Sequence, residues 1–327
     1  MSREALSSID RVWLGMEDPT HPMTITGLLV FDAPIEFERL RAVFSGRLHQ
    51  YPRFRQRIVP LGEDRDPAAW EDDPALDLDY HLKQISLPAP ADKRALRTVV
   101  GELMSKQLDL TKPLWQFHLI EPYGTGCALV GRVHHSLADG PALMHVLLAL
   151  TDADPSSSRS GTAVQAPAAS PGPAPGIAAR LTELLVQQGF NILFNPFRLR
   201  DLARLGTGTM AAMIKLLWRP PDPSTIFRGE LGVAKRVAWS KPVQLAEVKA
   251  VGRVVGGTVN DVMLAAATGA LRRYLVDRGE SVGGLTMRAG LSVNLRAPSA
   301  QPSLGNQAGA VLVELPVGLD TALDRLL

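Results

Sequence analysis

Two adjacent histidines, His134 and His135, begin the run His-His-Ser-Leu-Ala-Asp-Gly-Pro at residues 134–141. The apolar residues before them predict a strand at 127–135, and successive side chains of a strand point to opposite faces. This alternation disfavours one metal ion bound by both rings, and no cluster of cysteines or glutamates supplies other ligands. We therefore predict no metal site at these histidines.

The residues after the histidines predict the start of a helix. Pro141 suits the first helical position, and Asp139 or Gly140 suits the N-cap. The partial positive charge of a helix N-terminus favours a neutral imidazole, the form that a general base needs. His135 could then accept a proton from an alcohol that attacks an activated acyl carbon. The alternatives are a histidine that only packs at a strand end and an aspartate that only caps the helix, although Asp139 can do both.

The sequence contains no motif typical of several other catalytic mechanisms. There is no Gly-x-Ser-x-Gly nucleophile elbow, no phosphate-binding glycine loop and no dinucleotide fingerprint. Cys127 lies within an apolar strand and is more easily explained as a small buried hydrophobe than as a nucleophile. Direct transfer assisted by one base, without a cofactor, is the simplest mechanism.

The elements that must position this motif form a predicted N-terminal domain, residues 1–151. Sequence periodicity predicts strands at 23–31, 115–121 and 127–135, and helices at 36–50, 92–107 and 141–150. The acidic, proline-punctuated stretch 63–79 is interpreted as a surface loop.

Composition changes sharply after this domain. Residues 152–176 are rich in Pro, Ala, Ser and Gly and predict a disordered linker, because they can bury too little apolar surface to offset their ordering entropy. Residues 177–230 predict a helical connecting region, and 231–327 the start of a second α/β domain. The elements expected there are a strand at 235–239, helices at 245–255 and 260–277, and strands at 286–294 and 310–315. Thr258 to Asp261 has the pattern of a capping box for the second of these helices.

Composition narrows the class of protein. With 35 Lys and Arg against 33 Asp and Glu in 327 residues, the net charge of +2 gives no reason to expect nucleic acid as a partner. One cysteine excludes a disulfide scaffold and is typical of a reducing cytoplasm. The N-terminus has no apolar core of a secretory signal, and no run of about 18 apolar residues predicts a membrane span. We expect a cytoplasmic protein.

The motif His-His-x-x-x-Asp-Gly at 134–140 resembles the signature of a superfamily of CoA-dependent acyltransferases. Other segments resemble one of its branches, the bacterial wax ester synthase/diacylglycerol acyltransferases. These segments are Leu6 to Asp10, Pro19 to Met23, Pro52 to Arg57, Asp77 to Leu82, Pro113-Leu114-Trp115, Asn260-Asp261-Val262 and Leu304-Gly305-Asn306. Ser292 to Arg296 lies where that family has a Pro-Val-Ser-like strand, with Asn in place of Ser.

The resemblance implies a fold and a reaction. The fold would be α/β (α+β), with two chloramphenicol-acetyltransferase-like domains and a central channel. His135 would be the general base for attack by a diacylglycerol or a long-chain alcohol on a fatty acyl-CoA. Asn260 would donate to the oxyanion, with a plain N-cap as the alternative.

The remaining motif residues have supporting roles by the same resemblance. Asp139 would orient the motif, with Arg296 as one candidate partner, and His134 would be structural. Gly140 would allow the tight turn between strand and helix. Trp115, next to Pro113, would pack rather than contact the acyl group.

Lipid substrates imply a membrane or lipid-droplet surface. Residues 177–219 interleave basic and apolar side chains, so they could lie at an anionic interface, or form an ordinary packed helix pair. We expect peripheral association with the inner membrane or with lipid droplets. Two rival functions are a condensation-type enzyme that uses carrier-bound thioesters and a non-catalytic lipid-binding protein.

Residues 321–327 are interpreted as the first turns of a helix. Family members run longer, so we expect a missing C-terminal portion of the same protein to complete the second domain.

Overall fold

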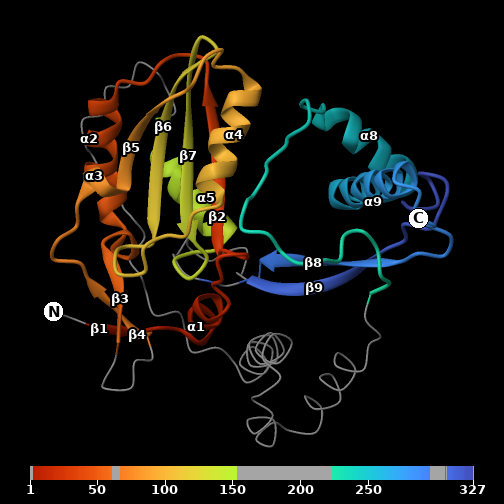
Figure 1. Cartoon of the computed structure of the whole chain (residues 1–327), viewed down its shortest axis with the longest axis horizontal. Helices are drawn as coiled ribbons and strands as arrows, with labels where there is room; N and C mark the ends of the chain where they lie inside the picture. Colours follow the sequence, from red (N-terminus) through yellow and green to blue (C-terminus); the bar gives the residue numbers. More distant parts are fainter. Residues whose placement is uncertain (1–2, 61–66, 153–221, 295–305, 307, 327) are drawn as a thin grey trace, which may run out of the picture. The chain divides into compact units, whose positions relative to one another are not determined.

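The computed structural model describes residues 3–60, 67–152, 222–294, 306 and 308–326 (Figure 1). The chain divides into two compact units, of which the first contains the N-terminal part together with 231–238 and 294–308. The second contains the described parts of 201–230, 239–293 and 309–327. The predicted linker after Asp152 and most of the predicted connecting region lie outside the described residues.

A four-stranded sheet forms the centre of the first unit. Its order is β2-β7-β6-β5, with β5 parallel to β6 and the other neighbours antiparallel. The strands are β2 (Thr24–Phe31), β5 (Leu82–Ser86), β6 (Trp115–Tyr123) and β7 (Gly126–His134). A separate three-stranded antiparallel sheet, in the order β1-β4-β3, comprises β1 (Arg3–Ala5), β3 (Gln56–Pro60) and β4 (Pro67–Asp72).

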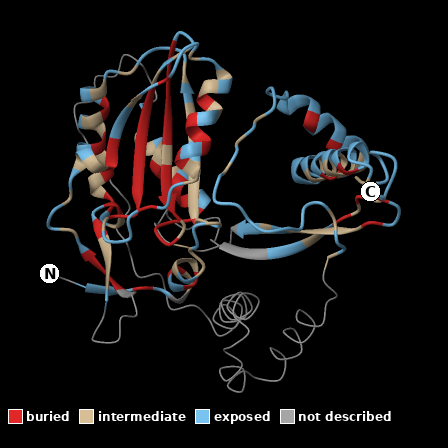
Figure 2. Ribbon diagram, in the orientation of Figure 1, coloured by how far each residue is buried: buried red, intermediate tan, exposed pale blue. Residues whose placement is uncertain are grey.

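Helices cover both faces of the four-stranded sheet, with α4 and α5 on opposite sides (Figure 1). The helices of this unit are α1 (Ser8–Gly15), α2 (Phe37–Arg47), η1 (Leu48–Gln50), η2 (Pro52–Phe54), α3 (Leu78–His81), α4 (Lys93–Met104) and α5 (Gly140–Ala149). The alternation predicted for β7 is observed. Cys127, Leu129 and Val133 join the core cluster with Phe44 of α2 and Leu143 of α5. Figure 2 shows β6 and β7 buried along most of their length.

The second unit contains α8 (Leu245–Val255), α9 (Val259–Asp277) and a two-stranded sheet of β8 (Met287–Asn294) and β9 (Ala308–Leu315). Its apolar cluster is built around Leu275, with Val282, Leu285, Leu315 and Val317. The predicted helices and the strands at 286–294 and 310–315 are thereby confirmed. The described part of the chain has no single helix long and apolar enough to cross a membrane, although α8 and α9 pass that test together across a 97° bend.

The surface-loop interpretation of 63–79 is wrong for most of the described part of that stretch. Residues 67–72 form β4, the central strand of its sheet, and 78–81 form α3. The side chains of Ala69 and Trp70 are fully buried. Burial of a tryptophan and pairing on both strand edges outweigh the local acidic composition, and neither effect is visible in a short sequence window.

Two smaller expectations also fail. Residues 235–239 form no strand, because Lys235 N–H donates to Ser105 Oγ at 2.7 Å instead of to a neighbouring backbone. Residues 321–326 form bends and turns rather than the start of an α-helix, with Leu326 N–H donating to the Leu323 carbonyl three residues back. Arg325 binds the carbonyls of Leu319 and Asp320 in this segment.

Candidate active site

The His-His motif lies where β7 gives way to α5. The strand ends at His134, one residue before the predicted end, and the helix begins at Gly140. In the intervening loop the backbone N–H of His135 donates to the Met23 carbonyl at 2.8 Å, and that of Leu137 to the His134 carbonyl at 3.0 Å. These bonds fix the loop to the start of β2 and to the end of β7.

His135 is half-buried, and its ring stacks on Trp13 of α1 with centroids 4.6 Å apart. Burial, reinforced by the neighbouring His134 and opposed by Asp139, lowers the pKa of His135 to about 4. The imidazole is therefore neutral at pH 7, as expected. The main cause is desolvation, whereas the sequence argument relied on the helix N-terminus.

The carbonyl of His135 is held by a side chain from far along the chain. Nδ2 of Asn306 donates to this carbonyl at 2.7 Å and to Oδ1 of Asp10 at 2.8 Å. Asp10 is buried on α1, and burial raises the pKa of its carboxyl against the opposing hydrogen bonds from Asn306 and Ser7. The opening segment, the histidine motif and the Gly-Asn segment thus meet at one point of the first unit.

His134 is fully buried and points away from the His135 side of the strand. Its Nδ1 accepts the backbone N–H of Ser136 at 3.0 Å and lies 2.7 Å from Ser136 Oγ. Its Nε2 lies 3.4 Å from Oε2 of Glu17. Because Nδ1 is an acceptor, the proton of the neutral ring belongs on Nε2, which faces this carboxylate.

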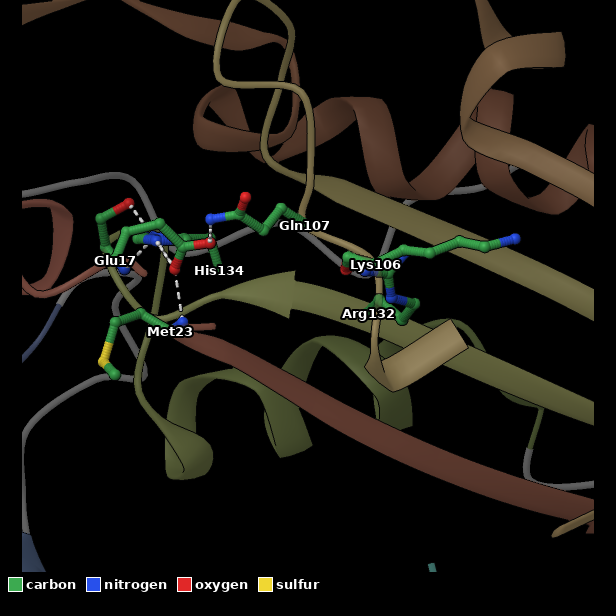
Figure 3. A network of polar contacts seen from close by, with 7 residues as sticks. Glu17, Met23, Lys106, Gln107, Arg132 and His134 are labelled. Carbon is green, nitrogen blue, oxygen red and sulfur yellow. Dashed lines mark hydrogen bonds and ion pairs between the residues drawn. The ribbon is translucent and has the colours of Figure 1, made fainter. Parts of the chain in front are cut away.

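Glu17 is half-buried and takes part in the network of polar contacts in Figure 3. Its carboxylate accepts hydrogen bonds from Met23 N–H and from Nε2 of Gln107. Burial alone would raise the pKa of Glu17, but hydrogen bonds from His134, Met23 and Gln107 hold it below the ordinary value. Sequence reasoning missed Glu17, although it stands two residues before the Pro-Thr-His-Pro-Met segment that was recognised.

Asp139 is the N-cap of α5. Its Oδ1 accepts the backbone N–H of Ala142 at 3.0 Å, and the residue is buried. The helix-cap expectation is therefore confirmed, which leaves an additional orienting role as a prediction. Its candidate partner Arg296 lies outside the described residues.

Gly140 and the Pro113-Leu114-Trp115 segment support the motif in different ways. Gly140 has no positive φ, so a tight turn does not explain the glycine, and a Cβ there would meet nothing within 4 Å. Trp115 is fully buried, donates from Nε1 to the Phe54 carbonyl at 2.8 Å and stacks on His81. The carbonyl of Leu114, between Pro113 and Trp115, accepts the His134 N–H at 2.9 Å.

Asn260 and Asp261 belong to the second unit. The cap of α9 is Thr258, whose N–H and Oγ1 both lie 2.7 Å from Oδ2 of Asp261, so the predicted capping box is confirmed. Asn260 is exposed in the first turn and is not the cap. The alternative that Asn260 is a plain N-cap is therefore wrong, and its oxyanion role stays a prediction.

Nothing in the described ranges groups three or more His, Cys, Asp or Glu side chains closely enough to hold a metal ion. Cys127 is fully buried, and burial raises the pKa of its thiol. Within the motif, His135 is a neutral, half-buried imidazole that can accept a proton.

Comparison with known proteins identifies the family of the chain. Residues 6–263 match the family model described as the wax ester synthase/diacylglycerol acyltransferase catalytic domain. The probable diacylglycerol O-acyltransferase tgs2 of Mycobacterium tuberculosis is 30% identical over 331 residues, which cover 97% of this chain and 70% of that protein. The related tgs1 of the same organism is 30% identical over 336 residues, covering 98% of this chain and 68% of its own length.

Solved structures show the same fold. The wax ester synthase/diacylglycerol acyltransferase of Marinobacter aquaeolei VT8 matches with a TM-score of 0.62 at 23% identity, covering 99% of this chain and 69% of its own. The first condensation domain of the CDA synthetase matches with a TM-score of 0.59 at 17% identity, covering 96% and 69%. The expected mixed α/β fold is confirmed.

Proposed function

This chain belongs to the wax ester synthase/diacylglycerol acyltransferase family, and on that premise we propose that it transfers a long-chain fatty acyl group from acyl-CoA to an alcohol. The acceptor is the hydroxyl of a diacylglycerol, a long-chain alcohol, or both. The observation that carries the proposal is the neutral, half-buried His135 in the loop between β7 and α5. The relatives named as diacylglycerol O-acyltransferases support the choice of acceptor.

The reaction needs one base and no covalent enzyme intermediate. A ring nitrogen of His135 takes the proton of the acceptor hydroxyl while the oxygen attacks the thioester carbonyl carbon. The tetrahedral intermediate then breaks its C–S bond, and the proton on His135 passes to the departing sulfur to give free CoA and the ester. No cofactor enters this balance.

General-base assistance contributes about 10²–10⁴ in rate, so the oxyanion also needs a donor. Asn260, in the first turn of α9, is our candidate for this role. Within the first unit, Trp13 stacks on the ring of His135, and the Asn306 side chain bonds to its carbonyl.

The substrates also imply a location. A diacylglycerol and a long-chain alcohol are nearly insoluble in water, so the enzyme must meet them at a lipid surface. We place it at the periphery of the inner membrane or of lipid droplets, with the basic and apolar residues 177–219 as the contact segment.

Substitution of the base tests the mechanism. His135→Ala should lower acyl transfer from long-chain acyl-CoA by about 10²–10⁴-fold, because the acceptor proton then has no base. Turnover is measured with labelled acyl-CoA and with diacylglycerol and hexadecanol in competition, and the products are separated.

His145→Ala is the matched control, because His145 lies on α5 and is also half-buried. It should retain turnover, and both variants should unfold at nearly the wild-type temperature. Near-normal turnover by a folded His135→Ala protein would contradict the mechanism. Transfer from carrier-bound acyl groups but not from free acyl-CoA would contradict the proposal that acyl-CoA is the acyl donor.

A further inference from the structure

A cavity of about 270 Å³ lies in the first unit between the four-stranded sheet and α5. Every residue that lines it is apolar or glycine. Ile25 and Leu29 of β2 line the sheet side, and Leu143, Met144 and Leu147 line the helix side. Such a lining offers no partner to a charged or hydrogen-bonding group and suits an aliphatic chain.

The cavity exists because two glycines face each other across strands. In the register of β2 and β7, Gly27 lies directly opposite Gly131, and both line the cavity. On the next strand Gly131 pairs with Phe117, whose ring would lie 2.5 Å from a Cβ at position 131. A Cβ at Gly27 would meet nothing within 4 Å. Between the side chains of Ile25 and Leu29, the floor of the cavity is therefore bare at Gly27, which is exposed, while the ring of Phe117 covers Gly131.

The cavity lies next to the base. Val133 and Gly140, which flank the His135 loop, both line it. The Cα atoms of Val133 and His135 are at most about 7 Å apart, because each residue of an extended chain spans about 3.3–3.6 Å. A chain that lies in the cavity can therefore present its head group near His135.

We propose that this cavity binds the aliphatic chain of a substrate and that the absence of a side chain at Gly27 sets how much of the chain it admits. The proposal rests on the acyl transfer proposed above, and the chain belongs to the acyl donor or to the acceptor alcohol. At ~30 Å³ for each group of water size, the cavity holds about nine such groups. Each methylene buried should raise the affinity about fourfold until the cavity is full.

Gly27→Leu tests this, because the new side chain enters the cavity from open space. Gly27→Ala is the smaller step, and Gly290→Leu on β8 is the matched control, since a Cβ at Gly290 also meets nothing within 4 Å. Binding is measured by displacement of a fluorescent fatty acid. One arm uses thioether analogues of acyl-CoA of increasing chain length, and the other uses 1-alkanols of increasing length.

The wild-type protein and Gly290→Leu should gain affinity with each added methylene. Gly27→Leu should stop gaining several carbons earlier, and Gly27→Ala should lie between them. The arm in which the gain is cut identifies the donor or the acceptor as the source of the chain. If Gly27→Leu behaves like Gly290→Leu in both arms, or if the wild-type affinity does not depend on chain length, the proposal is overturned.

Turnover of short-chain acyl-CoA is measured in parallel, because binding and catalysis can fail separately. A chain-length effect without any turnover would retain the cavity as a lipid site and reject the proposed reaction. Normal turnover with no effect of Gly27→Leu on chain-length dependence would contradict chain binding in the cavity and remain consistent with the proposed acyl transfer.

Discussion

His135 owes its neutral state mainly to burial, and the neighbouring His134 adds to the effect. A buried imidazole with a pKa of about 4 is a weaker base than a free one, but every copy of the enzyme holds it ready to accept a proton at pH 7. Trp13 stacks on one face of the ring and covers that face.

The low pKa of His135 predicts an unusual pH profile. Because kcat/KM reports the free enzyme, it should change by less than about twofold between about pH 7.5 and about pH 5.5, where a base with the ordinary pKa of ~6.5 would lose about tenfold. Below the folded pKa the ring is protonated and activity should fall. Initial rates in overlapping buffers, with circular dichroism at each pH to establish folding, measure this. A tenfold loss by pH ~5.5 in folded protein would show that another group, or a more exposed His135, controls the rate.

At the residue scale, the sequence identifies His134, His135 and Asp139, because they belong to one short motif of neighbouring residues. It gives no role to Glu17, Asp10 or Trp13, and no partner to Asn306. These residues act through contacts with segments distant in sequence, such as the Asn306 bond to Asp10. Only the tertiary fold brings such pairs together, and periodicity within one segment cannot encode them.

The elements follow from sequence wherever local pattern and tertiary context agree. β6, β7 and α4 have long apolar or amphipathic patterns and lie within a few residues of the predicted ranges. The surface-loop prediction fails at 67–72 because local composition and tertiary context disagree there. This short acidic segment becomes a central strand by pairing with β1 and β3. At 235–239 the backbone N–H of Lys235 donates to a serine side chain, and its Nζ donates to the carbonyls of Thr20 and Gly232, without a strand forming.

At the start of α9, the structural residue Thr258 and the catalytic candidate Asn260 lie only two positions apart. Thr258→Ala removes the cap and should lower the free energy of unfolding by about 1 kcal/mol. Asn260→Ala should leave the unfolding free energy nearly unchanged, because Asn260 is exposed and caps nothing, and should lower kcat with KM mostly intact if the amide stabilises the oxyanion.

Urea unfolding and steady-state kinetics on both variants distinguish the two effects. Unchanged kcat in Asn260→Ala would remove this residue from the catalytic machinery. A loss of stability in Asn260→Ala equal to that in Thr258→Ala would instead mean that the amide supports the helix start.

At the scale of the whole molecule the two units differ in how much apolar surface they bury. The core of the first unit draws on α2, β6, β7 and α5, whereas the described cluster of the second is small. Composition predicts two α/β units but not that 231–238 and 294–308 group with the first, because such grouping depends on contacts with distant residues. The chain spans about 70% of the length of the M. tuberculosis relative tgs2.

Contact with a lipid surface is a property of the whole chain. If residues 177–219 bind anionic lipid, replacing Arg198, Arg200 and Arg204 together by Gln should lower the fraction that floats with phosphatidylserine-containing vesicles. Each arginine near such a surface contributes about 1 kcal/mol, or about fivefold in partitioning, so the combined loss should exceed tenfold. Flotation in low salt measures it.

The matched control replaces three exposed arginines elsewhere, Arg39, Arg94 and Arg273, by Gln and keeps the same net charge. Equal partitioning of the two triple variants would assign the attraction to overall charge and dismiss residues 177–219 as a specific contact.

The two opposed glycines of the sheet differ in their freedom to change during evolution. Position 27 can accept a Cβ without meeting any neighbour within 4 Å, so a change to alanine there does not disturb the fold. Position 131 cannot, because the ring of Phe117 occupies the space that a side chain would need. A change at 131 must come with, or after, a smaller residue at 117. The sheet thus has one position at which natural variation is open and a neighbouring pair that can vary only together.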